Sequence, residues 1–137
     1  MLLGGGVNGR YGLDDGVFIK ANHAALAGGV GTAVKSTREK IGHLHKIEVE
    51  VVNERDVKEA LDNGADALSI EASDLGRVSQ LIAKAGRNSS GPSIVISGPI
   101  TIENARAFAE AGADLIRVDS LTQSVRAMDI SFQIQAG

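Results

Sequence analysis

Apolar and polar residues alternate along this chain with a period that switches repeatedly. Residues 46–52 read Lys-Ile-Glu-Val-Glu-Val-Val, and this period of two predicts a β-strand. Short apolar runs predict further strands at 17–20, 65–70, 93–97, 115–118 and 130–134. Helical spacing predicts helices at 24–41, at 56–62 after an Asn53 N-cap, at 75–85, at 101–111 after a Thr101 cap, and at 121–128. The pattern therefore predicts short strands that alternate with helices.

An internal repeat gives this pattern a fold class. Residues 57–66 and 105–114 each form an amphipathic helix, then a glycine suited to the left-handed position after a helix, then Ala-Asp and an apolar strand. Such repeated units indicate an α/β fold with parallel strands. Because the units are short and similar, a TIM-like barrel is favoured over an open doubly wound sheet. A complete eight-unit barrel takes about 250 residues, so 137 residues predict an incomplete barrel of about five to six strands in one domain, 1–137.

Composition removes several classes of function. The net charge of -3 gives no electrostatic reason to expect a nucleic-acid partner. No apolar run approaches the ~20 residues of a membrane span, so we expect no membrane partner. The chain has no cysteine, which excludes disulfides and thiolate metal sites. A cytoplasmic location is the resulting expectation.

The candidate chemistry begins in the glycine-rich opening, residues 4–13. Arg10 lies in this turn, and Lys20 ends the strand that follows. A bidentate guanidinium and a nearby ammonium suit a small, doubly anionic substrate. The alternative is that Arg10 is a solvated loop residue and Lys20 a strand end whose charge reaches solvent.

Carboxylates and a Ser-Gly turn follow later strands. Glu48 and Glu50 share one face of their strand, either exposed or directed into the barrel, where each needs a cation or hydroxyl partner. Glu71 ends the next strand. Ser97-Gly98 follows a strand and is predicted to open a helix, an arrangement that presents backbone N–H groups to phosphate.

Residues 4–13 and 19–23 resemble the substrate-binding segment of quinolinate phosphoribosyltransferase (carboxylating nicotinate-nucleotide pyrophosphorylase), GGGxNHRxGLxDxxxIKxNH. Gly9 stands where that motif has histidine. The resemblance implies a carboxylating nicotinate-nucleotide diphosphorylase, a pentosyltransferase of NAD biosynthesis. It would convert quinolinate and phosphoribosyl pyrophosphate (PRPP) to nicotinate mononucleotide, pyrophosphate and CO₂. The resemblance extends over nearly the whole of this chain but only over the C-terminal barrel portion of the family's proteins. We therefore expect the family's N-terminal α/β domain and first barrel segment to be absent, through truncation or degeneration.

The same resemblance assigns roles to individual residues. The predicted quinolinate-binding residues are Arg10, Lys20, Asn22 and His23. The predicted catalytic residues are Glu50, Glu71 and Lys20, with Glu50 and Glu71 also near the Mg²⁺ that accompanies PRPP. The predicted phosphate-binding residues are Ser97, Gly98, Asp119 and Ser120. Ala72, Pro99 and Asp119 depart from the family pattern, and Asp119 would bring negative charge towards an anion.

Two other functions stay open. One is a non-catalytic remnant that binds PRPP or phosphate, which the departures favour. The other is a related molybdenum-transport-associated homologue of this phosphoribosyltransferase. The segment Lys20-Ala21-Asn22-His23 favours the quinolinate enzyme over this relative. The expected assembly is a homodimer or an association through the open edge of the incomplete barrel.

Overall fold

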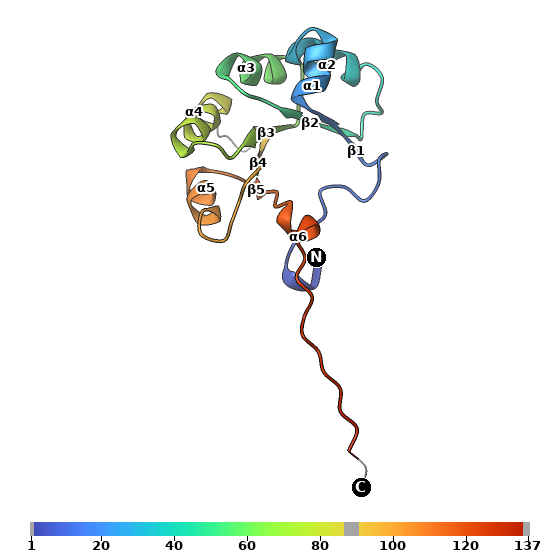
Figure 1. The fold of residues 1–137 in the computed structure, drawn as a ribbon. Coiled ribbons are helices and arrows are strands. Elements are labelled where there is room, and N and C mark those ends of the chain that lie inside the picture. Colours follow the sequence, from blue (N-terminus) through green and yellow to red (C-terminus); the bar gives the residue numbers. More distant parts are fainter. Residues whose placement is uncertain (1, 87–90, 136–137) are drawn as a thin grey trace.

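A computed structural model of the chain describes residues 2–86 and 91–135 (Figure 1). Five parallel strands form one sheet in the order β1-β2-β3-β4-β5. The strands are β1 (Gly16–Ile19), β2 (Lys46–Glu50), β3 (Ala67–Glu71), β4 (Ser93–Ser97) and β5 (Leu115–Ile116). The helices are η1 (Leu2–Gly4), α1 (Ala21–Ala27), α2 (Val30–Arg38), α3 (Glu54–Asp62), α4 (Leu75–Ala85), α5 (Ala105–Ala111) and α6 (Ser120–Gln123).

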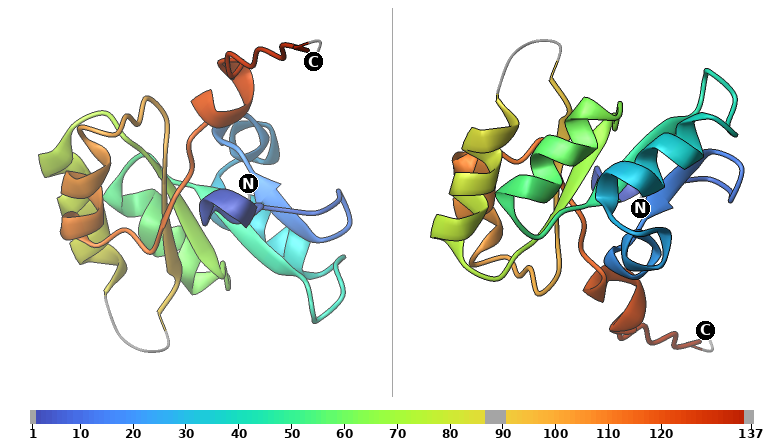
Figure 2. Two further views of the ribbon diagram at one scale, coloured as in Figure 1. Left: turned by 90° about the horizontal axis from the view of Figure 1, so that it is seen from below. Right: turned by 90° about the horizontal axis from the view of Figure 1, so that it is seen from above.

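The sheet curves, and the helices cover its outer side. Figures 1 and 2 show the strands as an arc with α2 to α5 along its convex face, as in part of a barrel. The predicted incomplete parallel barrel is confirmed, with five strands. Among the described residues, no helix is long and apolar enough to cross a membrane.

The period of two separates the faces of the sheet. Ile47 and Val49 of β2 are fully buried against the helices, whereas Glu48 between them lies on the concave face. Hydrogen-bonded register aligns Phe18 with Glu48, and Glu48 with Ala67, on that same concave face. The helix-covered face is therefore the apolar core, and the concave face carries polar and charged groups beside apolar ones such as Phe18 and Ala67.

The repeated Ala-Asp corner joins neighbouring strands. Asp66 Oδ2 accepts the backbone N–H of Ile47 at an N···O distance of 2.8 Å, at the start of β2. Asp114 Oδ2 accepts the N–H of Ile94 at 2.8 Å, at the start of β4. The glycine before each corner, Gly64 or Gly112, has a positive φ of 85° or 113°. Each copy of the repeat thus satisfies a backbone donor at the beginning of the adjacent strand.

The predicted helix at 24–41 is two helices. It begins earlier, at Ala21, and breaks between α1 and α2 at Gly28 and Gly29, whose φ values are 88° and 133°. Gly31 lies inside α2, where a Cβ would come 2.9 Å from Asn63 Nδ2. The helix after Asn53 is confirmed, since the Asn53 side chain accepts the N–H of Asp56 at 2.9 Å.

The C-terminal predictions need correction. Thr101 does not cap a helix: α5 begins at Ala105, because the Asn104 side chain accepts the Thr101 N–H at 2.8 Å and holds a turn before it. The helix predicted at 121–128 is the single turn of α6. The strand predicted at 130–134 is wrong, since within 125–135 the described residues form neither helix nor strand. Its apolar side chains are exposed, such as Phe132 at 86%.

Candidate active site

The carboxyl ends of the five strands lie side by side along one edge of the sheet. Lys20 follows β1, Glu50 ends β2 and Glu71 ends β3. Ser97 ends β4 and pairs in register with Glu71. Because all five strands are parallel, most of the predicted site residues come to this one edge.

Glu50 anchors the first helix of this edge. Its Oε2 accepts the backbone N–H of Ala21 at 2.8 Å, where a carboxylate also interacts favourably with the helix start. Lys20 is the N-cap residue of α1, and its backbone N–H donates to His23 Nδ1 at 3.2 Å. His23 is therefore engaged in capping, and Asn22 is exposed on α1 outside the pocket described below.

The Ser97-Gly98 turn packs closely against the end of β3. Gly98 has φ of +112°, and a Cβ there would lie 3.3 Å from Glu71 Cγ. The Ala72 N–H donates to the Ser97 carbonyl at 2.7 Å, and Ser97 Oγ lies 3.3 Å from Ser69 Oγ. The turn does not open a helix as predicted, because α5 starts only at Ala105. Any phosphate contact here would use the turn's own N–H and hydroxyl groups.

Asp119 and Ser120 lie at the start of α6 and are exposed. The Asp119 carbonyl accepts the N–H groups of Thr122 and Gln123, both at 3.0 Å. The Asp119 side chain makes no cap hydrogen bond. These two residues are thus placed after β5, outside the pocket of the concave face.

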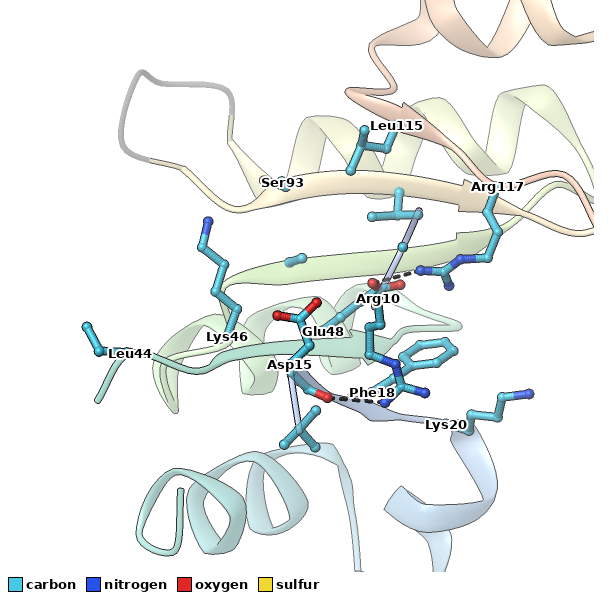
Figure 3. Close-up of a pocket in the computed structure, with 15 residues that line it drawn as sticks. Arg10, Asp15, Phe18, Lys20, Leu44, Lys46, Glu48, Ser93, Leu115 and Arg117 are labelled. Carbon is cyan, nitrogen blue, oxygen red and sulfur yellow. Dashed lines mark hydrogen bonds and ion pairs between the residues drawn. The ribbon is translucent and has the colours of Figure 1, made fainter. Parts of the chain in front are cut away.

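A pocket of about 800 Å³ opens on the concave face, between the N-terminal loop and the sheet (Figure 3). Of the predicted residues it brings together Arg10 and Lys20. Arg10 Nη1 donates to the Gly16 carbonyl at 3.1 Å, which holds the arginine over β1. The charged side chains that line the pocket are Arg10, Lys20, Lys46, Arg117, Asp15 and Glu48. Four cations against two carboxylates leave a net charge of two positive units.

Arg117 is one of three charged pocket residues, with Asp15 and Lys46, that the sequence analysis did not predict as site residues. Its Nη2 lies 2.9 Å from Glu48 Oε2, and its guanidinium carbon lies 4.9 Å from the centre of the Phe18 ring. Glu48 therefore has the cation partner that an inward carboxylate requires. The signal available in the sequence was an arginine within the apolar run Leu115-Ile116-Arg117-Val118. The pairing itself joins residues 69 positions apart, which no local pattern reports.

A metal ion finds few protein ligands at this edge. Among residues 2–86 and 91–135, no group of three or more His, Asp or Glu side chains could hold a metal. Mg²⁺ commonly binds one or two carboxylates and completes its shell with water and substrate phosphates. Glu50 and Glu71 could supply those one or two carboxylates, although Glu50 Oε2 already accepts the Ala21 N–H.

The fold and its cationic inner face define a partial (βα)-barrel protein with polar groups at the carboxyl ends of its strands. Residues 1–133 match the model of the family "Quinolinate phosphoribosyl transferase, C-terminal domain". The chain belongs to this family.

Relatives named nicotinate-nucleotide pyrophosphorylase (carboxylating) agree. The probable enzyme of Bacillus subtilis is 37% identical and that of Methanocaldococcus jannaschii is 35% identical, each over 96% of this chain. The human protein is 30% identical over 99% of this chain. A solved structure of the Francisella tularensis nicotinate-nucleotide pyrophosphorylase superposes with a TM-score of 0.83 at 32% identity, covering 96% of this chain.

The chain spans less than half the length of the proteins it resembles. It covers 44% of the Bacillus relative, 48% of the Methanocaldococcus relative and 46% of the Francisella structure. A solved NadC deletion mutant, with a TM-score of 0.83 and 31% identity, is likewise covered to 44% while 93% of this chain is matched.

Proposed function

We propose that this chain carries the quinolinate- and PRPP-binding barrel of a quinolinate phosphoribosyltransferase of NAD biosynthesis. One observation carries the proposal: complementary groups from consecutive strand ends meet at one edge, beside a pocket with two net positive charges. A dicarboxylate needs the positive pocket, and a phosphoribosyl group needs the hydroxyl, amide and carboxylate groups at the edge.

Arg10 and Lys20 are the proposed quinolinate contacts. Both line the pocket, and Lys20 Nζ lies 5.9 Å from the centre of the Phe18 ring. A guanidinium fork and a point-like ammonium can hold two adjacent carboxylates in one orientation. Asn22 and His23 contribute through the start of α1, which sets the direction of Lys20.

PRPP is proposed to lie across the ends of β2 to β4. Ser97 and Gly98 would bind its 5′-phosphate, with Asp119 and Ser120 further along the edge. Glu71 would face the ribose, because its Cγ lies next to Gly98. Mg²⁺ would arrive with the diphosphate, and Glu50 and Glu71 would supply carboxylate oxygens to it.

The proposed reaction forms a bond between the quinolinate ring nitrogen and C1 of the ribose, while the bond from C1 to the diphosphate breaks. Positive charge develops on the ribose, where Glu50 and Glu71 stabilise it electrostatically. The carboxylate next to the ring nitrogen then leaves as CO₂, and a proton takes its place. A cytoplasmic location and a homodimer, or association through the open sheet edge, belong to this proposal.

The test measures nicotinate mononucleotide formed by the purified chain from quinolinate, PRPP and Mg²⁺. Arg10→Ala should lower kcat/KM for quinolinate about 10- to 100-fold, since loss of a charged hydrogen bond costs about 1.5–3 kcal/mol. Arg106→Ala, which removes an exposed pair with Glu110 on α5, is the matched control and should leave kcat/KM unchanged. No product with intact binding of Mg²⁺ and PRPP would instead support the non-catalytic remnant.

A further inference from the structure

The concave face holds one guanidinium that neither the family motif nor the proposed roles account for. The Arg117 backbone N–H donates to the Ile96 carbonyl at 2.8 Å, so this residue continues the line of β5 beside β4. Its side chain crosses the inner face to Glu48 on β2, past two intervening strands (Figure 3). Arg117 therefore reaches the middle of the pocket from its far wall.

Two contacts fix the guanidinium in the pocket and leave donors available. The Phe18 ring lies 4.9 Å from its central carbon, and Glu48 Oε2 lies 2.9 Å from Nη2. An arginine has five N–H donors, and among the described residues this guanidinium donates to the one carboxylate oxygen. The ion pair uses one of these donors, rather than the two of a bidentate fork. The remaining donors can bind a ligand.

Glu48 is itself only half satisfied. Its side chain is 19% exposed, and its second oxygen, Oε1, is buried without a hydrogen-bond partner among the described residues. A buried carboxylate oxygen without a partner is costly. Glu48 binds Arg117 through a single hydrogen bond, from Nη2 to Oε2. A ligand carboxylate would compete with Glu48 for this guanidinium.

Gly9 opens the space next to this guanidinium. A Cβ on Gly9 would lie 3.8 Å from Arg117 Nη2. A longer side chain at position 9 would therefore lie beside the Arg117 guanidinium. The motif that the chain resembles has histidine there, and this chain has none. Without Arg117 the charged pocket lining would carry a net of one positive charge, one less than the two negative charges of a dianion.

We propose that Arg117 is a third cationic contact for the dicarboxylate, occupying the place that Gly9 leaves open and held ready there by Glu48 and Phe18. The inference rests on the proposed function, because it names a further residue of the same quinolinate pocket. Arg117 adds a third cation to Arg10 and Lys20, so its loss should weaken the binding of a diacid more than that of a monoacid.

The test is calorimetric binding of benzene-1,2-dicarboxylate, a diacid that lacks the ring nitrogen and cannot react, against benzoate as the monoacid. Arg117→Gln should weaken diacid binding about 10- to 100-fold and monoacid binding less than about threefold. Glu48→Gln should strengthen diacid binding, because the competing carboxylate is gone. Gly9→His added to Arg117→Gln should restore part of the lost affinity. Arg106→Gln is the unaffected control.

The outcomes separate the two proposals. Diacid binding that is weakened by Arg10→Gln but unchanged by Arg117→Gln overturns this inference and leaves the proposed function standing. Absence of diacid binding by the unaltered chain contradicts both. If the Arg117→Gln variant shows no cooperative unfolding, it is not folded, and the Glu48→Gln variant then provides the test. Tighter diacid binding by Glu48→Gln supports the inference. Weaker or unchanged binding overturns it and shows that the Arg117–Glu48 pair is structural.

Discussion

The two faces of the curved sheet differ in what they do. On the helix-covered face the central residues are apolar and none is more than 2% exposed: Ile47, Val49, Leu68, Ile70, Ile94 and Ile96. The concave face carries Lys46, Glu48 and Arg117, each in or beside an open pocket. Stability and chemistry are therefore divided between side chains that alternate along the same strands. Substitutions at two neighbouring positions of one strand should therefore differ, one affecting stability and the other the pocket.

The largest expected effect is on the helix-covered face. Leu68→Ala should lower the free energy of unfolding by about 2–5 kcal/mol, because Leu68 is fully buried and the cavity cannot close completely. Urea unfolding followed by circular dichroism measures the loss. The adjacent Ser69→Ala is the matched control on the concave face. It removes a 3.3 Å hydroxyl contact with Ser97 and should cost only about 0.5–1.5 kcal/mol. Equal losses would contradict the division between faces.

A smaller effect sharpens the comparison at the strand ends. Gly98→Ala should cost about 1–3 kcal/mol because φ is +112°. It should also weaken Mg²⁺-dependent PRPP binding, because the new methyl group would meet Glu71 Cγ at 3.3 Å. Gly28→Ala shares the positive φ, at 88°, but has nothing within 4 Å. It should lose similar stability and keep PRPP binding, and a loss of binding in both variants would remove the special role of Gly98.

The smallest effect lies on the outer helices. A hydrogen bond from Arg55, then one from the Gly31 N–H, lowers the pKa of Glu59 below its ordinary value of 4.5. The ionised form is favoured in the folded chain, so its stabilisation is present above the ordinary pKa and is lost as pH falls through the lowered one. Glu59→Gln should slightly reduce the melting temperature at pH 7 and reduce it less at a pH well below 4.5. A melting temperature that drops equally at both pH values would rule out this charge effect.

The sequence predicted the helix-covered face better than the concave one. Period-two alternation at 46–52 and the repeated Gly-Ala-Asp corner are local signals, and they correctly predicted parallel strands under helices. The break at Gly28-Gly29 was not predicted, and glycine alone is a weak signal for one, since Gly31 and Gly76 lie inside α2 and α4. The strand predicted at 130–134 has the right alternation but no partner strand among the described residues.

The strand ends of the site were predictable, whereas in the pocket Arg10 and Lys20 were predicted and the Arg117–Glu48 pair was not. Glu71 and Ser97 could be placed at one edge because parallel strands present their carboxyl ends together. The Arg117–Glu48 pair depends on the curvature of the sheet, which brings β5 opposite β2. Curvature is a property of the packed sheet and leaves no pattern in either segment alone.

Thermal unfolding of the purified chain, with and without PRPP and Mg²⁺, tests the central claim that the concave edge is a phosphoribosyl site. A ligand that binds only the folded chain adds about 2.7 kcal/mol to the free energy of unfolding when its concentration is about 100 times its Kd. We therefore predict a cooperative transition whose midpoint rises with PRPP and Mg²⁺ together and rises less with Mg²⁺ alone. A cooperative transition with an unchanged midpoint at saturating PRPP would contradict the account.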